Sequence, residues 1–159
     1  MTGARGTLAR NAGYACGADL LARWNVDTTG FFQADACGAH GYFSPDFMTR
    51  LLMRIAGSDI HEAFLAGLPV LGRDGTLWDT QPDSPAAGRV AAKTGTLSIE
   101  DSRRNTLFTC KGLAGYLTAK SGRRLAFTIY LNNLLCARSS HINPGELLGE
   151  VANAIYEHA

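Results

Sequence analysis

The sequence predicts an α+β fold in which helices come first, antiparallel strands follow, and one further helix closes the chain. Two kinds of apolar spacing support this prediction. Apolar residues recur at helical spacing in 45–56 and again in 144–157, whereas apolar and polar residues alternate in 124–132. The first pattern is typical of amphipathic helices and the second of half-buried strands, so we expect a sheet with helices packed against it.

The N-terminal part predicts small elements. Residues 17–24 (GADLLARW) favour a short helix, and Asp-Thr-Thr-Gly at 27–30 favours a turn. Phe31 and Phe32 begin a short predicted strand that reaches Asp35, where a loop of small residues follows. Asp35 itself is interpreted as a loop-capping carboxylate, because Asp readily accepts hydrogen bonds from nearby backbone N–H groups.

Two helices are predicted next. Ser44 is a suitable N-cap for the first, with Pro45 at its opening position and Gly57 at its end. The second is expected to begin near Ser58 or Asp59. Asp59 with Glu62 fits a capping box, and Ile60, Ala63 and Phe64 form the predicted apolar side.

Three strands are predicted after a long surface connection at 68–88. They span 90–97, 113–119 and 124–132, and Lys120-Ser121-Gly122-Arg123 joins the last two as a hairpin in which Gly122 takes positive φ. The intervening segment 98–111 allows two arrangements: it lengthens the hairpin after the first strand, or it lies across a cleft mouth. On the last strand, one face carries Leu125, Phe127, Ile129 and Leu131.

The closing helix is predicted from its cap and its apolar side. Asn143 is the expected N-cap, with Pro144 and Glu146 in the first turn. The predicted buried positions are Leu147, Leu148, Val151, Ala152 and Ile155.

Composition limits the class of protein. The chain has 159 residues, 46% of them hydrophobic and 18% charged, with a formal net charge of +1. This indicates one globular domain over 1–159 and gives no reason to expect a nucleic-acid partner. No apolar run reaches membrane-spanning length, and the N-terminal residues contain no apolar stretch of signal-peptide length.

The four cysteines predict no metal site, because Cys16, Cys37, Cys110 and Cys136 show neither C-x-x-C spacing nor a histidine at zinc-site spacing. Small buried thiols are expected. In an oxidising compartment, one or two disulfides are the alternative. Cys37 and His40 could form a nucleophile pair, but a structural cysteine and a surface histidine are the favoured interpretation.

The strongest candidate for chemistry is Lys93-Thr94-Gly95-Thr96. On a strand, the Lys93 cation and the Thr94 hydroxyl can bind a carboxylate, and Gly95 lets a ligand lie close to the backbone. The Thr96 N–H can donate to a developing oxyanion. Taken alone, the tripeptide K-T-G is common in proteins, and it then favours a strand end with a solvated lysine.

The surrounding segments carry a resemblance. AFLAGLPVLGRDGTL at 63–77, GRVAAKTGTL at 88–97 and GLAGYLTAKSGRRLAFTIYLNN at 112–133 resemble, in this order, the C-terminal part of the penicillin-binding-protein-type D-alanyl-D-alanine carboxypeptidase/endopeptidases of low-molecular-mass class C. VDTTGFFQADACG and SPDFMTRLL extend the resemblance to roughly residues 17–157. It implies part of a β-lactamase/transpeptidase-like fold.

The resemblance implies a serine peptidase of peptidoglycan stem peptides, placed in the periplasm or cell envelope and needing no cofactor. In the family, S-x-x-K supplies the acylating serine, which β-lactams also trap, and S-x-N and K-T-G complete the site. Lys93, Thr94 and Gly95 would then bind the substrate's D-Ala-D-Ala end, and the Thr96 N–H would be one oxyanion donor.

The chain departs from the family at the nucleophile. No serine is followed three residues later by lysine, or two residues later by asparagine. The chain therefore resembles the C-terminal segment of such an enzyme without these two motifs. Where the family has an Asp-Gly-Ser-Gly loop, Asp35-Ala36-Cys37-Gly38 stands instead; Ala36 lacks the conformational freedom of glycine.

Three functions stay open at this point. The first is the peptidase of the family. The second is a non-catalytic module that binds D-Ala-D-Ala peptides or a partner chain. The third is an inactive remnant whose exposed sheet edge needs a second copy or another chain to cover it.

Overall fold

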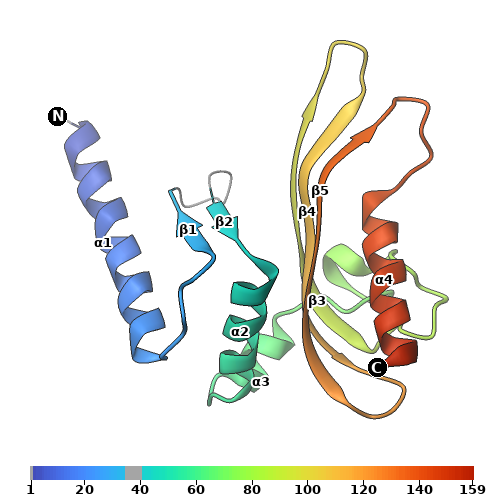
Figure 1. The fold of residues 1–159 in the computed structure, drawn as a ribbon, viewed down its shortest axis with the longest axis horizontal. Helices are drawn as coiled ribbons and strands as arrows, with labels where there is room; N and C mark the ends of the chain where they lie inside the picture. Colours follow the sequence, from blue (N-terminus) through green and yellow to red (C-terminus); the bar gives the residue numbers. More distant parts are fainter. Residues whose placement is uncertain (1, 35–40) are drawn as a thin grey trace. The chain divides into compact units, whose positions relative to one another are not determined.

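The computed structural model describes residues 2–34 and 41–159. The chain divides into two compact units, Met1–Arg54 and Ile55–Ala159 (Figure 1). Each unit has its own cluster of buried apolar side chains. None of the described helices is long and apolar enough to cross a membrane.

The first unit holds a helix and a small sheet. It contains α1 (Thr2–Arg23), β1 (Phe31–Gln33), β2 (Gly41–Phe43) and most of α2 (Pro45–Ala56). β1 and β2 pair in antiparallel fashion, with Phe31 opposite Phe43. Their aromatic rings form a cluster with the end of α1 and the start of α2, whose members are Leu21, Val26 and Phe47 with Trp24, Phe31, Phe43 and Leu51 at the margin.

The start of α2 is capped as the sequence predicts. The Ser44 hydroxyl accepts a hydrogen bond from the Phe47 N–H at 3.1 Å. α1, in contrast, is much longer than the predicted 17–24 helix, because no proline interrupts a run rich in good helix formers. Near the C-terminal end of α2, the Arg54 guanidinium donates a hydrogen bond to the Trp24 carbonyl at 3.0 Å and lies over the Trp24 ring.

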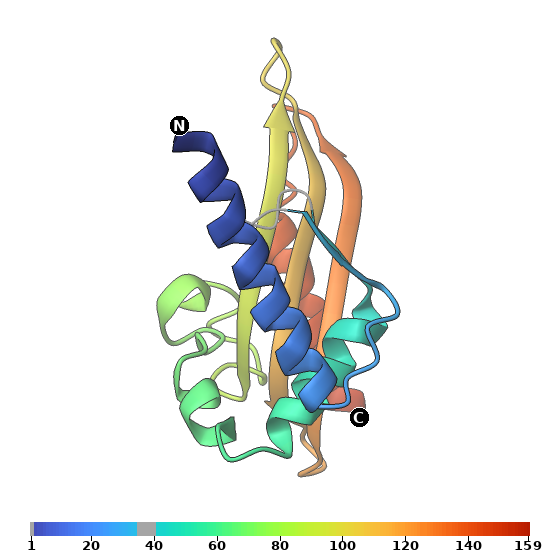
Figure 2. The ribbon, with the colours of Figure 1, turned by 90° about the vertical axis from the view of Figure 1, so that its left-hand side faces the viewer.

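The second unit is a sheet with helices. It contains α3 (His61–Ala66), a short 3₁₀ helix (Gly75–Leu77), β3 (Val90–Glu100), β4 (Thr106–Thr118), β5 (Arg124–Cys136) and α4 (Pro144–His158). Both strand pairs are antiparallel, and Figure 2 shows the three strands side by side in the order β3-β4-β5. The α+β prediction is therefore confirmed.

The core of this unit lies between α4 and one face of the sheet (Figure 1). Val90, Leu113 and Phe127 come from the three strands, and Leu148 and Ala152 come from α4. The predicted apolar face of the last strand is confirmed, because Phe127 is buried and the other three residues pack against the same cluster. Burial of these side chains is the main stabilising contribution to this unit.

The opposite face of the sheet is contacted by α3. The His61 and Phe64 rings of α3 meet the Tyr116 ring edge-on, with ring centroids 5.1 and 6.3 Å apart. Tyr116 pairs with Ala91 across the strands. Because side chains alternate along a strand, Ala91, Lys93 and Gly95 belong to this α3 side, and Val90 and Ala92 to the α4 side.

Segment 98–111 lengthens the hairpin, which is the first of its two predicted arrangements. β3 and β4 continue pairing as far as Glu100 and Thr106, beyond the expected strand ends. The register shifts by one residue between Leu97 and Ser98, where Thr109 is the extra residue of a β-bulge. The Thr109 hydroxyl donates to the Leu97 carbonyl at 3.1 Å and stabilises this irregularity.

The β4–β5 turn and the N-terminus of α4 follow the sequence prediction. Gly122 takes φ +86° in the β4–β5 turn. Asn143 caps α4, because its Oδ1 accepts from the Gly145 and Glu146 N–H groups at 2.9 and 3.4 Å. Val151, however, is 44% exposed, so the buried side of α4 is narrower than predicted.

Two other predictions are wrong. The capping box of Asp59 and Glu62 does not form: α3 begins at His61, its N-cap is Ile60 without a side-chain cap bond, and Ile60 is exposed. The preceding turn, in which His61 N–H donates to the Ser58 carbonyl, occupies the predicted first residues. Cys16 is exposed rather than buried, because its place on α1 lies outside the aromatic cluster.

Candidate functional site

Among the described residues of the second unit, backbone pairing with the outer edge of β3 occurs only at the start of the strand. The segment 69–71 pairs with the start of β3: the Leu71 N–H donates to the Val90 carbonyl, and the Ala92 N–H donates to the Pro69 carbonyl, both at 2.9 Å. These bonds show that the backbone groups of Val90 and Ala92 point away from β4. Since the direction of backbone groups alternates along a strand, those of Thr94 and Thr96 point outward too.

Lys93 lies beside this edge. Its side chain is exposed and belongs to the α3 side of the sheet. The Nζ atom donates to the outward-pointing Thr94 carbonyl at 3.0 Å and lies 3.5 Å from the Thr94 hydroxyl. The ammonium group and the Thr94 hydroxyl are thus close enough to bind one anion together.

Gly95 leaves open space between the two threonines. A Cβ atom built on Gly95 would meet no atom within 4 Å. Its partner across the strands is Gly112, so two residues without side chains lie next to each other. A ligand can therefore approach the backbone closely at this position.

Lys111 is a further cation at the site. It pairs with Thr96 across the strands, and its Nζ donates to the Thr96 hydroxyl at 2.8 Å. Burial, and then the positive charge of Lys93, lowers the pKa of Lys111 below its ordinary value. The two lysines therefore produce a positive potential at the edge, which favours an anionic ligand.

The structure thus brings Lys93, Thr94, Gly95 and Thr96 to a stretch of strand edge that no other described segment of the second unit pairs with, and it adds Lys111. The sequence offered no signal for Lys111, because the bulge near Leu97 sets which β4 residue faces Thr96. Among described residues, no group of three metal-ligating side chains occurs.

The described cysteines show no sign of an activated nucleophile. Cys16, Cys110 and Cys136 are free thiols, and burial raises the pKa of the Cys110 thiol, which disfavours the reactive thiolate. Cys37, His40 and Asp35 lie outside the described residues, as does the rest of the loop at 35–38.

Comparison with protein families gives one match. The sequence profile of the D-Ala-D-Ala carboxypeptidase 3 (S13) family matches residues 5–145. Comparison with curated proteins finds no match.

Comparison with solved structures finds a similar fold. Penicillin binding protein 4 (dacB) from Haemophilus influenzae superposes with a TM-score of 0.69 at 23% identity, over 88% of this chain and 30% of that chain. The same protein complexed with a novel β-lactam gives a TM-score of 0.67 at 22% identity, over 88% of this chain and 32% of that one. This chain thus spans about a third of the length of the structures that it resembles.

Proposed function

Because the chain belongs to the D-Ala-D-Ala carboxypeptidase 3 (S13) family, we propose that the β3 edge binds the C-terminal end of a peptidoglycan stem peptide that ends in D-Ala-D-Ala. A β-lactam would bind at the same edge. Residues 1–159 would form the C-terminal segment of such a peptidase domain, acting in the periplasm or cell envelope.

The observation that carries this proposal is the direction of the backbone at Thr94 and Thr96. Both residues present their N–H and C=O groups away from β4. Earlier in the same strand, the groups that point this way at Val90 and Ala92 are bound by Leu71 and Pro69. An extended peptide can add to this row as a further strand. The main chain then supplies affinity and alignment, independent of the ligand's side chains.

The side chains give the edge a preference for a chain end. In the proposed complex, Lys93 and the Thr94 hydroxyl bind the terminal carboxylate by charge-assisted hydrogen bonds. Gly95 allows the peptide to lie close to the strand. The Thr96 N–H is positioned to donate to the carbonyl oxygen of the last amide, as an oxyanion donor. Lys111 donates a hydrogen bond to the Thr96 hydroxyl and adds a second positive charge to the site.

Hydrolysis would need a nucleophile beyond those seen at this edge. No serine of these 159 residues has lysine three positions later or asparagine two positions later. We therefore propose binding without acyl transfer for this chain by itself. Labelling with a fluorescent penicillin tests this: we expect no covalent adduct, and a stoichiometric adduct would contradict the proposal.

Binding itself is tested by titrating the ¹⁵N-labelled chain with D-Ala-D-Ala. We expect saturable chemical-shift changes at Lys93, Thr94 and Thr96, and their loss in Lys93→Ala. Lys120→Ala is the matched control, because Lys120 pairs with Glu157 on α4 and should not affect binding. Absence of shifts at the β3 edge, or equal binding by Lys93→Ala, would refute the proposed site.

A second candidate is a partner-binding module without catalysis. Ile99, Leu107 and Leu135 stand opposite one another on the three strands, and Ile99 and Leu135 are 61% and 66% exposed. Large apolar side chains side by side on a surface are typical of association sites. A second copy of the chain that covers this row would form a homo-oligomer.

A further inference from the structure

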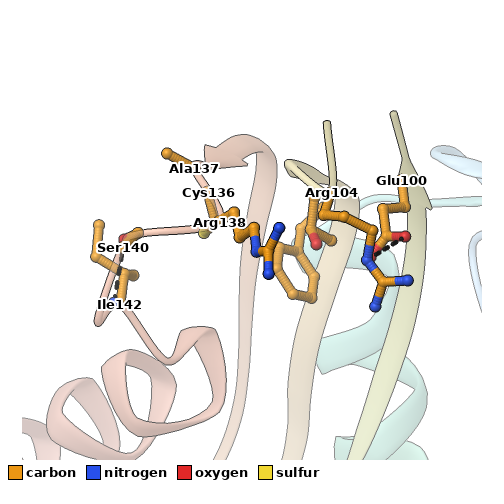
Figure 3. Close-up of a pocket in the computed structure, with 9 residues that line it drawn as sticks. Glu100, Arg104, Cys136, Ala137, Arg138, Ser140 and Ile142 are labelled. Carbon is orange, nitrogen blue, oxygen red and sulfur yellow. Dashed lines mark hydrogen bonds and ion pairs between the residues drawn. The ribbon is translucent and has the colours of Figure 1, made fainter. Parts of the chain in front are cut away.

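A cavity of about 480 Å³ lies between the tip of the β3–β4 hairpin and the loop that leads from β5 to α4 (Figure 3). Its lining includes none of Lys93, Thr94, Gly95, Thr96 and Lys111, the residues of the site described above. Its walls carry charged, polar and apolar groups together, including Glu100, Arg104, Phe108, Cys136, Arg138 and Ser140. This volume is within the range of small-molecule sites.

The cavity has an excess of positive charge. Arg104 and Arg138 face it from opposite walls, and Glu100 is the one carboxylate in its lining. Glu100 is bound to Arg104, with Oε1 and Nε 3.2 Å apart. Within the described part of the chain, the Arg138 guanidinium makes no ion pair, and Figure 3 shows it directed from its loop toward the side of Arg104. An anion between the two walls would pair with it.

The two walls are tied to each other by hydrogen bonds. Asp101 holds the hairpin turn: its Oδ1 accepts from the Arg103 and Asn105 N–H groups, at 2.8 and 2.9 Å, and the pKa of its carboxyl group is lowered by its hydrogen bonds from Asn105. The Asn105 Oδ1 then accepts from the Arg138 N–H at 3.1 Å. These bonds fix the backbone of the two segments that carry the arginines, while the Arg104 and Arg138 side chains themselves are exposed.

Arg104 has a backbone conformation that glycine would adopt more easily. Its φ is +66°, in the left-handed region, which residues with a Cβ atom adopt less readily than glycine does. Glycine at 104 would relieve this strain and leave the turn bonds of Asp101 in place.

The apolar part of the lining defines the rest of the ligand. Phe108 and the buried Cys136 lie on the cavity wall beside the arginines. Guanidinium groups bind carboxylates and phosphates in bidentate fashion, and an aromatic ring offers a partner for another ring. We propose that this cavity binds a small organic anion in which a carboxylate or phosphate group is attached to an aromatic group, of about the size of phenyl phosphate.

The test is a titration of the ¹⁵N-labelled full chain with phenyl phosphate and, separately, with 3-phenylpropionate. We expect saturable chemical-shift changes at Arg104, Phe108 and Arg138 with at least one of these two compounds. The compound with the lower dissociation constant identifies the preferred anionic group. Inorganic phosphate and benzyl alcohol each supply half of the ligand, so both should bind more weakly.

Two variants connect the binding to the arginines. Arg104→Gly and Arg138→Gln should each weaken binding by about tenfold, since each removes a charge-assisted hydrogen bond. Arg104→Gly should melt no lower than the parent chain, which separates loss of binding from loss of fold. Arg103→Gln is the matched control in the same turn, because Arg103 does not line the cavity, and it should bind as the parent does.

Three results would overturn the proposal. The first is the absence of saturation with either aromatic anion below about 10 mM. The second is shifts confined to residues outside the cavity. The third is equal affinity in the parent chain, Arg104→Gly and Arg138→Gln.

Discussion

At the scale of single residues, glycines of β3 and β4 serve opposite purposes. Gly95 faces open space, whereas a Cβ atom on Gly115 would lie 2.2 Å from the Ala91 carbonyl oxygen and 2.6 Å from the Ala92 Cα. Gly115 is therefore required by the packing of two strands against each other. No described atom near Gly95 requires glycine there, so under the proposed function its role is to admit a ligand.

Substitution of each glycine by alanine should distinguish an effect on stability from an effect on ligand binding. Gly115→Ala should destabilise the chain by about 1–3 kcal/mol, because backbone atoms must move to admit the methyl group. Gly95→Ala should leave stability nearly unchanged and weaken D-Ala-D-Ala binding. Urea unfolding and the titration described above measure the two effects; equal stability of the two variants would contradict this account.

The two lysines at the β3 edge should be coupled. Lys93→Gln removes a neighbouring positive charge and should raise the pKa of Lys111 toward its ordinary value of 10.5. NMR titration of the Lys111 side chain in the two proteins checks this. Lys120→Gln, which alters a lysine paired with Glu157, should leave the Lys111 titration unchanged.

The same lowered pKa has a consequence for stability. Between the lowered pKa and 10.5, the unfolded chain binds more protons at Lys111 than the folded chain does, so this residue makes stability rise with pH. In Lys111→Met that contribution should disappear. Denaturation midpoints of the two proteins, compared across alkaline pH, should therefore converge as the pH approaches 10.5; a constant difference would argue against it.

At the scale of elements, α4 depends on its N-cap. Asn143→Ala removes the acceptor for two N–H groups and should cost about 1 kcal/mol of stability. Asn143→Asp keeps an acceptor and adds a negative charge near the helix N-terminus, so it should retain the parent's stability. Thermal unfolding of the three proteins checks this order, and equal stability of Asn143→Ala and the parent would contradict the role of the cap.

At the scale of the whole molecule, the exposed apolar row on the sheet should cause self-association. Ile99→Lys places a charge in the row and should shift sedimentation toward the monomer. Val151→Lys is the matched control, since Val151 is an exposed apolar residue of α4 outside the row. If the parent chain sediments as a monomer at all concentrations and unfolds cooperatively, the predicted self-association is wrong.

The sequence by itself determined the kinds of elements and much of their order. The spacing of apolar residues and the helix-capping residues are local signals. They predicted the Ser44 and Asn143 caps, the Gly122 turn and the inward face of β5. The same locality explains its errors. Asp59 and Glu62 have the spacing of a capping box, but the turn made with Ser58 displaces the helix start.

Only the tertiary structure decided what surrounds K-T-G. The register of β3 against β4, with its bulge after Leu97, places Lys111 opposite Thr96, and segment 69–71 fixes which backbone groups point outward. Both depend on pairing between residues distant in the chain, which local patterns do not encode. The sequence could identify Lys93 as a candidate ligand of an anion; the sheet edge determines where that anion would lie.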